Sequence, residues 1–134
     1  MKYAVLTGRI LFALIFLVGG LGHFSARSIG YASAAGIPFA SVIVPISGII
    51  SILGALSVIT GYKARAGAWL LIIFMLPVTF IMHQFWNIQD PMMKQMDMAM
   101  FMKNLGLLGG AIFIAYFGAG PLSIDEKTKT AVLA

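Results

Sequence analysis

Five polar or amphipathic side chains stand out in this chain because almost everything around them is apolar: His23, His83, Trp86, Lys103 and Asn104. Imidazole, amine and amide groups can hydrogen-bond the polar end of a ligand, and an indole ring can pack against its apolar part. Ionisable groups close to a membrane span are typical of such sites. The alternative is that the histidines and Lys103 only anchor helix ends at the membrane surface. The five residues therefore form a candidate ligand pocket.

A cluster of methionines adjoins these residues and suggests a second kind of chemistry. Met92, Met96 and Met100 recur at every fourth position, which places them on one face of a helix. Thioether sulfurs are soft ligands that suit Cu(I), whereas methionine also serves as a flexible apolar filler. Filler is the favoured interpretation and a Cu(I) site is the alternative. The two histidines lack a third firm ligand, so no zinc site is expected.

The composition identifies the environment of the chain. Hydrophobic residues make up 60% of the 134 residues and charged residues 10%, and the mean hydropathy is +0.99. Soluble domains carry about 25% charged residues, so this chain could not cover a surface that faces water. The net charge of +5 does not indicate nucleic-acid binding, because the few cations adjoin apolar runs, where they set membrane topology. The absence of cysteine excludes disulfides and dithiol redox chemistry.

Four stretches are long and apolar enough to span a bilayer, which needs about 20 residues. They cover residues 4–24, 40–60, 66–86 and 99–117. All should be helical, because exposed backbone finds no hydrogen-bond partner in lipid. We therefore predict an all-α integral membrane four-helix bundle that forms a single domain, residues 1–134. No acidic residue lies within these spans, which argues against a proton-coupled multidrug transporter.

The positively charged residues assign an orientation to the bundle. Regions on one side carry most of them: Lys2, Arg9, Lys63, Arg65, Lys127 and Lys129. The opposite loops hold only Arg27 and Lys94. The positive-inside rule then places both termini in the cytoplasm, which suits a multi-pass protein of the bacterial cytoplasmic (inner) membrane. The five candidate pocket residues fall together at the external end.

Small residues predict where the helices touch. They recur every four positions in two spans, as Ser47, Ser51 and Ala55 in the second and as Gly106 and Gly110 in the fourth. Such stripes allow close helix contact. Packing within one bundle is the favoured interpretation, and a homo-oligomer is the alternative. Lys103 shares the helix face of the two glycines, so we expect it to point into the bundle.

Other local signals predict a distortion and the helix ends. Pro77 frees the carbonyl of Ile73 and predicts a kink that widens the external half of the bundle. Ser28 is the expected N-cap of a short turn in the first external loop. Asp90 and Pro91 should start a helix that runs into the fourth span. A polar, mobile tail is expected after that span.

Several motifs together resemble the DoxX family of small four-helix membrane proteins from bacteria and archaea. The matching stretches include GRILFALIFLVGGLGHF at 8–24, YASAAGIP at 31–38, GALSVITGYKARAGAWLL at 54–71, FIMHQFW at 80–86, FMKNLGLLGG at 101–110 and FGAGPLSID at 117–125. They cover nearly the whole chain, and FMKN and GAGPLSID are the most specific. His23 departs from the family, in which relatives often have a lysine.

The resemblance implies a membrane subunit of an oxidoreductase system, since relatives include a subunit of an archaeal thiosulfate:quinone oxidoreductase. It implies a quinone as the possible cofactor, bound at the external helix ends near His83 and Lys103. The chain carries no intrinsic redox group, so a partner redox subunit would supply the electron donor. The alternatives are a non-catalytic anchor or scaffold that recruits partner proteins, and a small-molecule or Cu(I) carrier.

Overall fold

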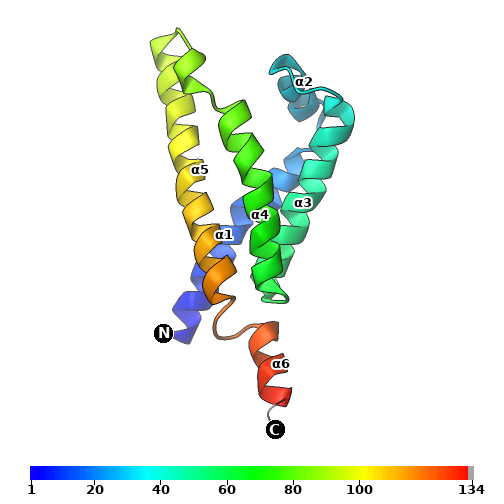
Figure 1. The fold of residues 1–134 in the computed structure, drawn as a ribbon, viewed down its shortest axis with the longest axis vertical. Coiled ribbons are helices and arrows are strands. Elements are labelled where there is room, and N and C mark those ends of the chain that lie inside the picture. Colours follow the sequence, from blue (N-terminus) through cyan, green and yellow to red (C-terminus); the bar gives the residue numbers. More distant parts are fainter. Residues whose placement is uncertain (133–134) are drawn as a thin grey trace.

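The computed structural model describes residues 1–132, which form helices and no strand. The elements are α1 (Lys2–Gly22), α2 (Ala26–Ala34), α3 (Ala40–Thr60), α4 (Ala64–Pro77), the π-helix η1 (Val78–Met82), the 3-10 helix η2 (Phe85–Asn87), α5 (Pro91–Phe117) and α6 (Ile124–Val132). Four segments of this range are long and apolar enough to cross a membrane: Lys2–Gly22, Ala40–Thr60, Ala64–Asn87 and Pro91–Phe117. The predicted all-α membrane fold is confirmed, and the start of α1 lies at the same end as α6 (Figure 1).

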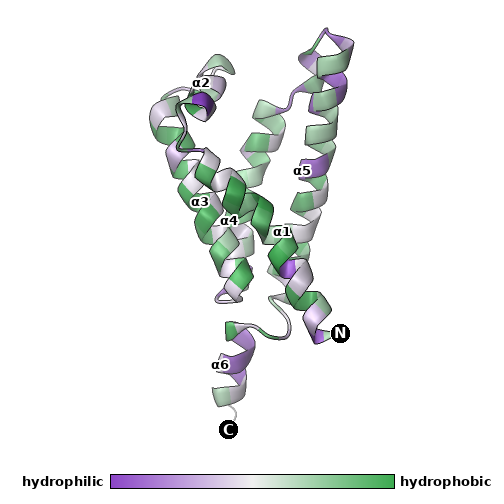
Figure 2. Cartoon of the chain, turned by 180° about the vertical axis from the view of Figure 1, so that it is seen from behind, coloured by the Kyte–Doolittle hydropathy of each residue, from purple (hydrophilic) through white to green (hydrophobic). Residues whose placement is uncertain are grey.

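The surface of the four long helices is apolar along most of its length. Figure 2 shows hydrophobic residues along the lengths of α1, α3 and α4, whereas hydrophilic residues gather on α6, on α2 and near the start of α5. Large exposed side chains such as Leu11, Ile46, Trp69 and Phe113 would be unfavourable in water, and lipid is their natural solvent. The protein is therefore in contact with the lipid bilayer over most of its surface.

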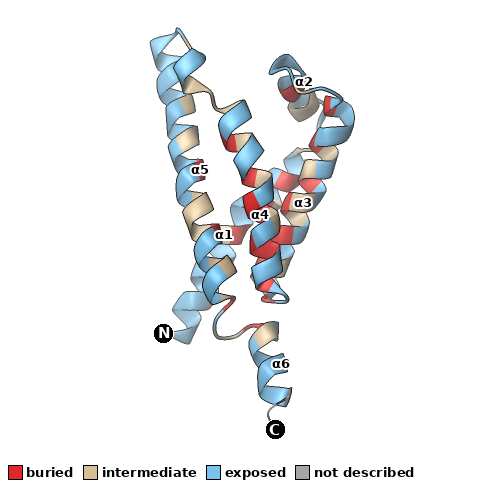
Figure 3. Ribbon diagram, in the orientation of Figure 1, coloured by how far each residue is buried: buried red, intermediate tan, exposed pale blue. Residues whose placement is uncertain are grey.

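The core lies where the first three long helices meet. In sequence order the long helices pack α1 on α3, α3 on α4 and α4 on α5. The largest buried cluster takes two residues from each of α1, α3 and α4: Ala13, Phe16, Ala55, Val58, Leu71 and Met75. Figure 3 shows buried residues concentrated in this region, while most of α5 is exposed. Only Asn104 and Ala111 of α5 are buried.

Small residues bring these helices close together, as the sequence predicts for α3. A Cβ atom added to Gly48 of α3 would lie 2.8 Å from the carbonyl oxygen of Gly20 in α1. Ser51 is fully buried, and its hydroxyl donates a hydrogen bond of 2.8 Å to the carbonyl of Phe16. The stripe that contains Ser51 is therefore the contact face of α3 toward α1.

Only one of the two glycines in the GxxxG motif of α5 packs against another helix of the bundle. A Cβ atom on Gly110 would lie 2.8 Å from the ring of Phe12 in α1, whereas one on Gly106 would meet nothing within 4 Å. Gly106 is also exposed. The expectation that both glycines face into the bundle is thus wrong for Gly106, which lies on the outer side of the helix.

The third span loses regular α-helical geometry at the predicted proline. The α-helical part ends at Pro77, and the chain continues as the π-helix η1. Proline has no amide hydrogen for the carbonyl of Ile73, so the regular hydrogen-bond ladder is interrupted there. The predicted distortion is therefore present as a π-helix, a rare element that is frequent at functional sites.

Two helix starts show where capping signals succeed and fail. The side chain of Asp90 accepts a hydrogen bond of 2.8 Å from the amide of Met93, and Pro91 is the first residue of α5. The predicted helix start at Asp90 and Pro91 is therefore confirmed. The helix also includes residues that precede the apolar span, which was predicted to begin at residue 99. The Ser28 cap is wrong, because Ser25 caps α2 and accepts from the Ser28 amide at 3.2 Å.

The segment after α5 is ordered, although the sequence suggested a mobile tail. Residues 124–132 form α6. The carboxylate of Asp125 accepts hydrogen bonds from the amides of Lys63 at 2.8 Å and Ala64 at 3.0 Å. The amide of Asp125 donates in turn to the carbonyl of Gly61 at 2.9 Å. The start of α6 therefore caps α4, which fixes the segment against the turn between α3 and α4.

Candidate functional site

A cavity of about 630 Å³ lies between the end of α1, α2, α3 and the distorted part of the third span. It is at the end of the bundle that the charge distribution predicts to be external. This end is called the external end below, and the orientation stays a prediction. Its polar lining consists of His23, Arg27, Ser28, Tyr31, Ser47 and His83. Its apolar lining includes Val44, Ile50, Ile73, Phe74, Val78 and Ile81. Its size is within the range of small-molecule sites, which span about 300–1,000 Å³.

The walls of the cavity follow from two local features of the chain. The first is α2, which packs on α3 through a small buried cluster of Ala32, Ala40 and Val44. The second is the stretch after Pro77, whose π-helical turn supplies Val78, Ile81 and Met82 to the opposite wall. The predicted widening at Pro77 thus coincides with a cavity.

His23 is held in one orientation by a chain of hydrogen bonds. Its Nδ1 atom lies 2.8 Å from the hydroxyl oxygen of Ser47, and that hydroxyl donates to the carbonyl of Val44 at 2.7 Å. Because a serine has a single hydroxyl hydrogen, Nδ1 of His23 must be the donor to Ser47. In the neutral ring, Nε2 then carries no hydrogen and can accept a hydrogen bond from a ligand. The ring of Phe74 lies beside it, with centroids 5.5 Å apart.

His83 is tied to a different helix. Its Nδ1 atom lies 2.8 Å from the carboxylate of Asp97, and both side chains are largely buried, with 18% and 14% of their surface exposed. This contact is a hydrogen bond to a carboxylate, and it is an ion pair only when the His83 ring is protonated. It joins the end of η1 to the external part of α5, so it fixes the cavity wall that carries His83.

The structure brings together two of the five predicted pocket residues. His23 and His83 line the same cavity, whereas Trp86, Lys103 and Asn104 do not. Trp86 packs with Phe85 and Phe101, with ring centroids 5.1 Å and 5.8 Å away. A ligand-binding role for the three residues outside the cavity stays a prediction.

The expected orientation of Lys103 is wrong by one helical position. Asn104 and Ala111 are the buried residues of α5, and they lie seven positions apart, which corresponds to about two turns on one face. Lys103 is rotated by about 100° from that face and is exposed. Its amine lies 3.5 Å from the sulfur of Met100.

The methionines of α5 form an exposed stripe. Met92, Met96 and Met100 are 74%, 63% and 41% exposed, so they face outward rather than into the bundle. This placement suits apolar contact with lipid, and Cu(I) binding at these three residues stays a prediction. Within residues 1–132 no group of three or more histidine, cysteine, aspartate or glutamate side chains could hold a metal ion.

Comparison with known proteins identifies the family. Residues 1–131 match the SURF4 family. The chain belongs to the SURF4 family. The inner membrane protein YqjF of Escherichia coli is 30% identical over 124 residues, which cover 91% of this chain and 89% of YqjF. The inner membrane protein YphA of Escherichia coli is 25% identical over 125 residues, 92% of this chain and 89% of YphA.

A eukaryotic relative extends the family beyond bacteria. The Surfeit locus protein 4 homolog of Schizosaccharomyces pombe is 29% identical over 128 residues, 95% of this chain but 38% of the relative. No solved structure matches the chain. The two bacterial relatives and the four apolar helices make this SURF4-family chain a multi-pass inner membrane protein.

Membership of the SURF4 family overturns the assignment to the DoxX family. The expected role as a membrane subunit of an oxidoreductase system was inferred from that assignment and is wrong with it. The physical reason is that the quoted motifs are mostly small and apolar residues, which close helix packing in lipid favours in membrane proteins generally. Such stretches indicate a four-helix membrane protein but do not discriminate between families.

Sequence reasoning missed several residues that line the cavity of this SURF4-family protein. Ser47 was read only as a packing residue, and Arg27 only as a topology signal. Phe74 and Ile50 lie within uniformly apolar helices and carry no distinguishing signal. The usable clue was Pro77, since a break in a membrane helix leaves room beside it.

Proposed function

We propose that this SURF4-family protein binds an amphipathic molecule from the external half of the membrane, with the polar head of that molecule between His23 and Arg27. The observation that carries the proposal is the external cavity, which combines a polar rim with an apolar interior. The proposed role is binding rather than catalysis.

The polar rim offers complementary groups to an acidic headgroup. The guanidinium of Arg27 can donate two parallel hydrogen bonds to a carboxylate or phosphate. Ser28 and His23 line the same rim. Nε2 of the neutral His23 ring can accept a hydrogen bond from a protonated head, and the same nitrogen donates when the ring is charged. These groups favour a headgroup that both accepts and donates hydrogen bonds.

The apolar part of the cavity opens toward the bilayer. Ile43 of α3 and Ile73 and Ile81 of the third span line the cavity, yet they are 43%, 58% and 44% exposed. Exposure on both walls indicates an opening between these two helices, on the side that faces lipid. An amphipathic molecule could therefore enter sideways and keep its apolar body in the hydrocarbon layer.

The identity of the ligand and the state of assembly belong to this proposal. A quinone is one amphipathic molecule with a polar head, and its binding stays a prediction. A partner redox subunit was expected only because of the oxidoreductase role, so it is not part of this proposal. A homo-oligomer also stays a prediction, and the exposed side of α5 around Gly106 is where a second copy would approach most closely.

The proposal is tested with a fatty acid that carries a fluorescent dansyl group at the end of its chain, titrated into the protein in phosphatidylcholine nanodiscs. We expect saturable fluorescence above that of empty nanodiscs. Ile50→Phe should weaken binding at least tenfold, because the larger ring occupies the apolar interior. Arg27→Gln should weaken it severalfold, because the amide loses the charge.

The matched control is Ile49→Phe, since Ile49 is the neighbour of Ile50 on α3 but is 48% exposed and does not line the cavity. We expect this variant to bind the probe as the wild type does. Equal loss in both phenylalanine variants, or no saturable signal in the wild type, would overturn the proposal.

A further inference from the structure

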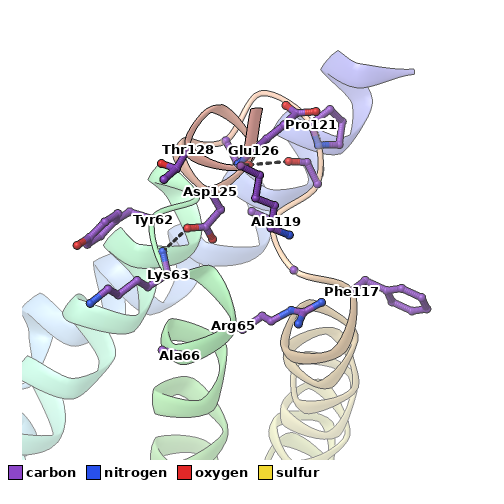
Figure 4. Close-up of a pocket in the computed structure, with 14 residues that line it drawn as sticks. Tyr62, Lys63, Arg65, Ala66, Phe117, Ala119, Pro121, Asp125, Glu126 and Thr128 are labelled. Carbon is purple, nitrogen blue, oxygen red and sulfur yellow. Dashed lines mark hydrogen bonds between the residues drawn. The ribbon is translucent and has the colours of Figure 1, made fainter. Parts of the chain in front are cut away.

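A second cavity, of about 1140 Å³, lies at the opposite, cytoplasmic end of the molecule. It is bordered by the turn between α3 and α4, the end of α5, the linker at residues 118–123 and the start of α6 (Figure 4). Three cations line it, Lys63, Arg65 and Lys129, together with the carboxylates of Asp125 and Glu126. It shares no residue with the external cavity.

The two carboxylates are turned toward backbone amides rather than toward the cations. Asp125 accepts from the amides of Lys63 and Ala64, the first of which is drawn in Figure 4. Glu126 accepts from the amide of Leu122 at 2.8 Å. Within residues 1–132, neither acid forms an ion pair with Arg65 or Lys129. The cations are therefore available to an anion from outside the chain.

Arg65 is the best placed of the three. In Figure 4 its side chain extends from α4 toward the end of α5. Its Nε atom would lie 3.5 Å from a Cβ atom on Gly118, so it adjoins the residue that ends α5. No hydrogen bond links its guanidinium to another residue of the described range. Lys63, by contrast, already lies over the ring of Tyr62, with its amine 5.6 Å from the centroid.

The depth of this cavity matches the headgroup layer of the inner leaflet. Three spans end beside it: α3 at Thr60, α4 at Ala64 and α5 at Phe117. Tyr62 and Phe117 line it and are 53% and 69% exposed, which is typical of aromatic side chains at the membrane interface. An anion held by Arg65 would therefore lie at the level of lipid phosphates. Ala66 and Phe117 continue the wall toward the hydrocarbon layer, where acyl chains would lie.

We propose that this cytoplasmic cavity binds the phosphate headgroup of an anionic phospholipid, with the guanidinium of Arg65 as the group that holds the phosphate. Guanidinium groups match phosphate with two parallel hydrogen bonds. Basic pockets between membrane helices on the cytoplasmic side are suited to such headgroups. The lipid tails would extend along the apolar wall, which distinguishes a phospholipid from free phosphate.

The test measures retention of phosphatidylglycerol by the delipidated protein in detergent, using native mass spectrometry during a titration. We expect the wild type to bind phosphatidylglycerol at least tenfold more tightly than phosphatidylcholine. Arg65→Gln should remove about tenfold of that affinity, and Arg65→Lys should remove part of it, because a lysine keeps the charge but not the fork. Retention of wild-type affinity by Arg65→Gln would overturn the proposal.

Two further arms separate the alternatives. Lys94→Gln removes one positive charge from an exposed position at the external end of α5, and we expect it to bind phosphatidylglycerol as the wild type does. Equal losses in Lys94→Gln and Arg65→Gln would indicate an effect of net charge alone and would overturn the site. Inorganic phosphate at 10 mM should not displace the lipid. Full displacement would assign the site to a soluble anion and refute the phospholipid.

Discussion

Replacing Arg9 should loosen the linker between α5 and α6 where it meets α1, while Asp125 still holds the start of α6. Arg9 is 5% exposed. One guanidinium nitrogen donates to the carbonyl of Ala119 at 2.8 Å and the other to the carbonyl of Leu122 at 3.0 Å. These bonds join residues more than a hundred positions apart in the sequence. Arg9 therefore supplies the hydrogen bonds that fasten the linker to α1.

The expected magnitude follows from the two hydrogen bonds. A hydrogen bond that involves a charged group contributes about 1.5–3 kcal/mol. Arg9→Leu loses both and leaves two carbonyls without their donor, so at the lower figure we expect a loss of about 3 kcal/mol in the free energy of unfolding. Arg9→Lys keeps the charge but not the fork, so we expect about half that loss.

The assay combines reversible unfolding in mixed detergent micelles with amide hydrogen exchange. In Arg9→Leu, exchange should accelerate at residues 118–123 and remain unchanged in the middle of α3 and α4. Lys94→Ala is the control, because Lys94 is exposed and distant from the linker. Wild-type stability in Arg9→Leu, or uniform acceleration of exchange across all helices, would refute the assignment of Arg9 as the linker contact.

Three further experiments test helix packing and buried polar contacts. Gly67→Ala should destabilise the fold by about 1–3 kcal/mol, because its Cβ would collide with the Ser57 side chain and lie 3.1 Å from the Gly54 carbonyl oxygen. Gly106→Ala is the control and should be neutral, because its Cβ would meet nothing within 4 Å. Equal unfolding temperatures for the two variants would contradict this prediction. Thr79→Val should leave the free energy of unfolding unchanged or raise it by about 1 kcal/mol, because the Thr79 hydroxyl is fully buried without a hydrogen-bond partner. A clear loss of stability on unfolding by denaturant would contradict this prediction. A double-mutant cycle with His83→Ala and Asp97→Ala should give a coupling energy of about 0.5–2 kcal/mol, since the groups lie 2.8 Å apart, and strictly additive losses would exclude that interaction.

The fold could be predicted because each of its determinants is local in the sequence. Four apolar runs of sufficient length specify four spans. Asp90 with Pro91 specifies the start of α5, and Pro77 specifies the place where the third span loses regular geometry. Ser51 marks the contact face of α3, because small residues recur there every four positions.

The site could be predicted only in part, because its geometry depends on rotation and on long-range contacts. Lys103 and Asn104 differ by about 100° around α5, and apolar neighbours on all sides give no signal for which of them faces inward. The partner of His23 is Ser47, on another helix, and the partners of Arg9 are two carbonyls in the distant linker. A single sequence carries no record of such pairs.

The two ends of the molecule are built differently, and this difference favours the external end as the one that adapts to a ligand. At the end predicted to be cytoplasmic, Arg9 and Asp125 fasten the linker and α6 through hydrogen bonds to backbone groups. At the external end, the third span is π-helical after Pro77, and its one side-chain hydrogen bond to α5 within residues 1–132 is His83 with Asp97, beside aromatic packing on Phe101. A helix without its regular ladder costs less to displace than one with every bond in place. We therefore expect amide exchange to be faster in η1 than in α4, and binding of the amphipathic probe to slow exchange in η1 specifically.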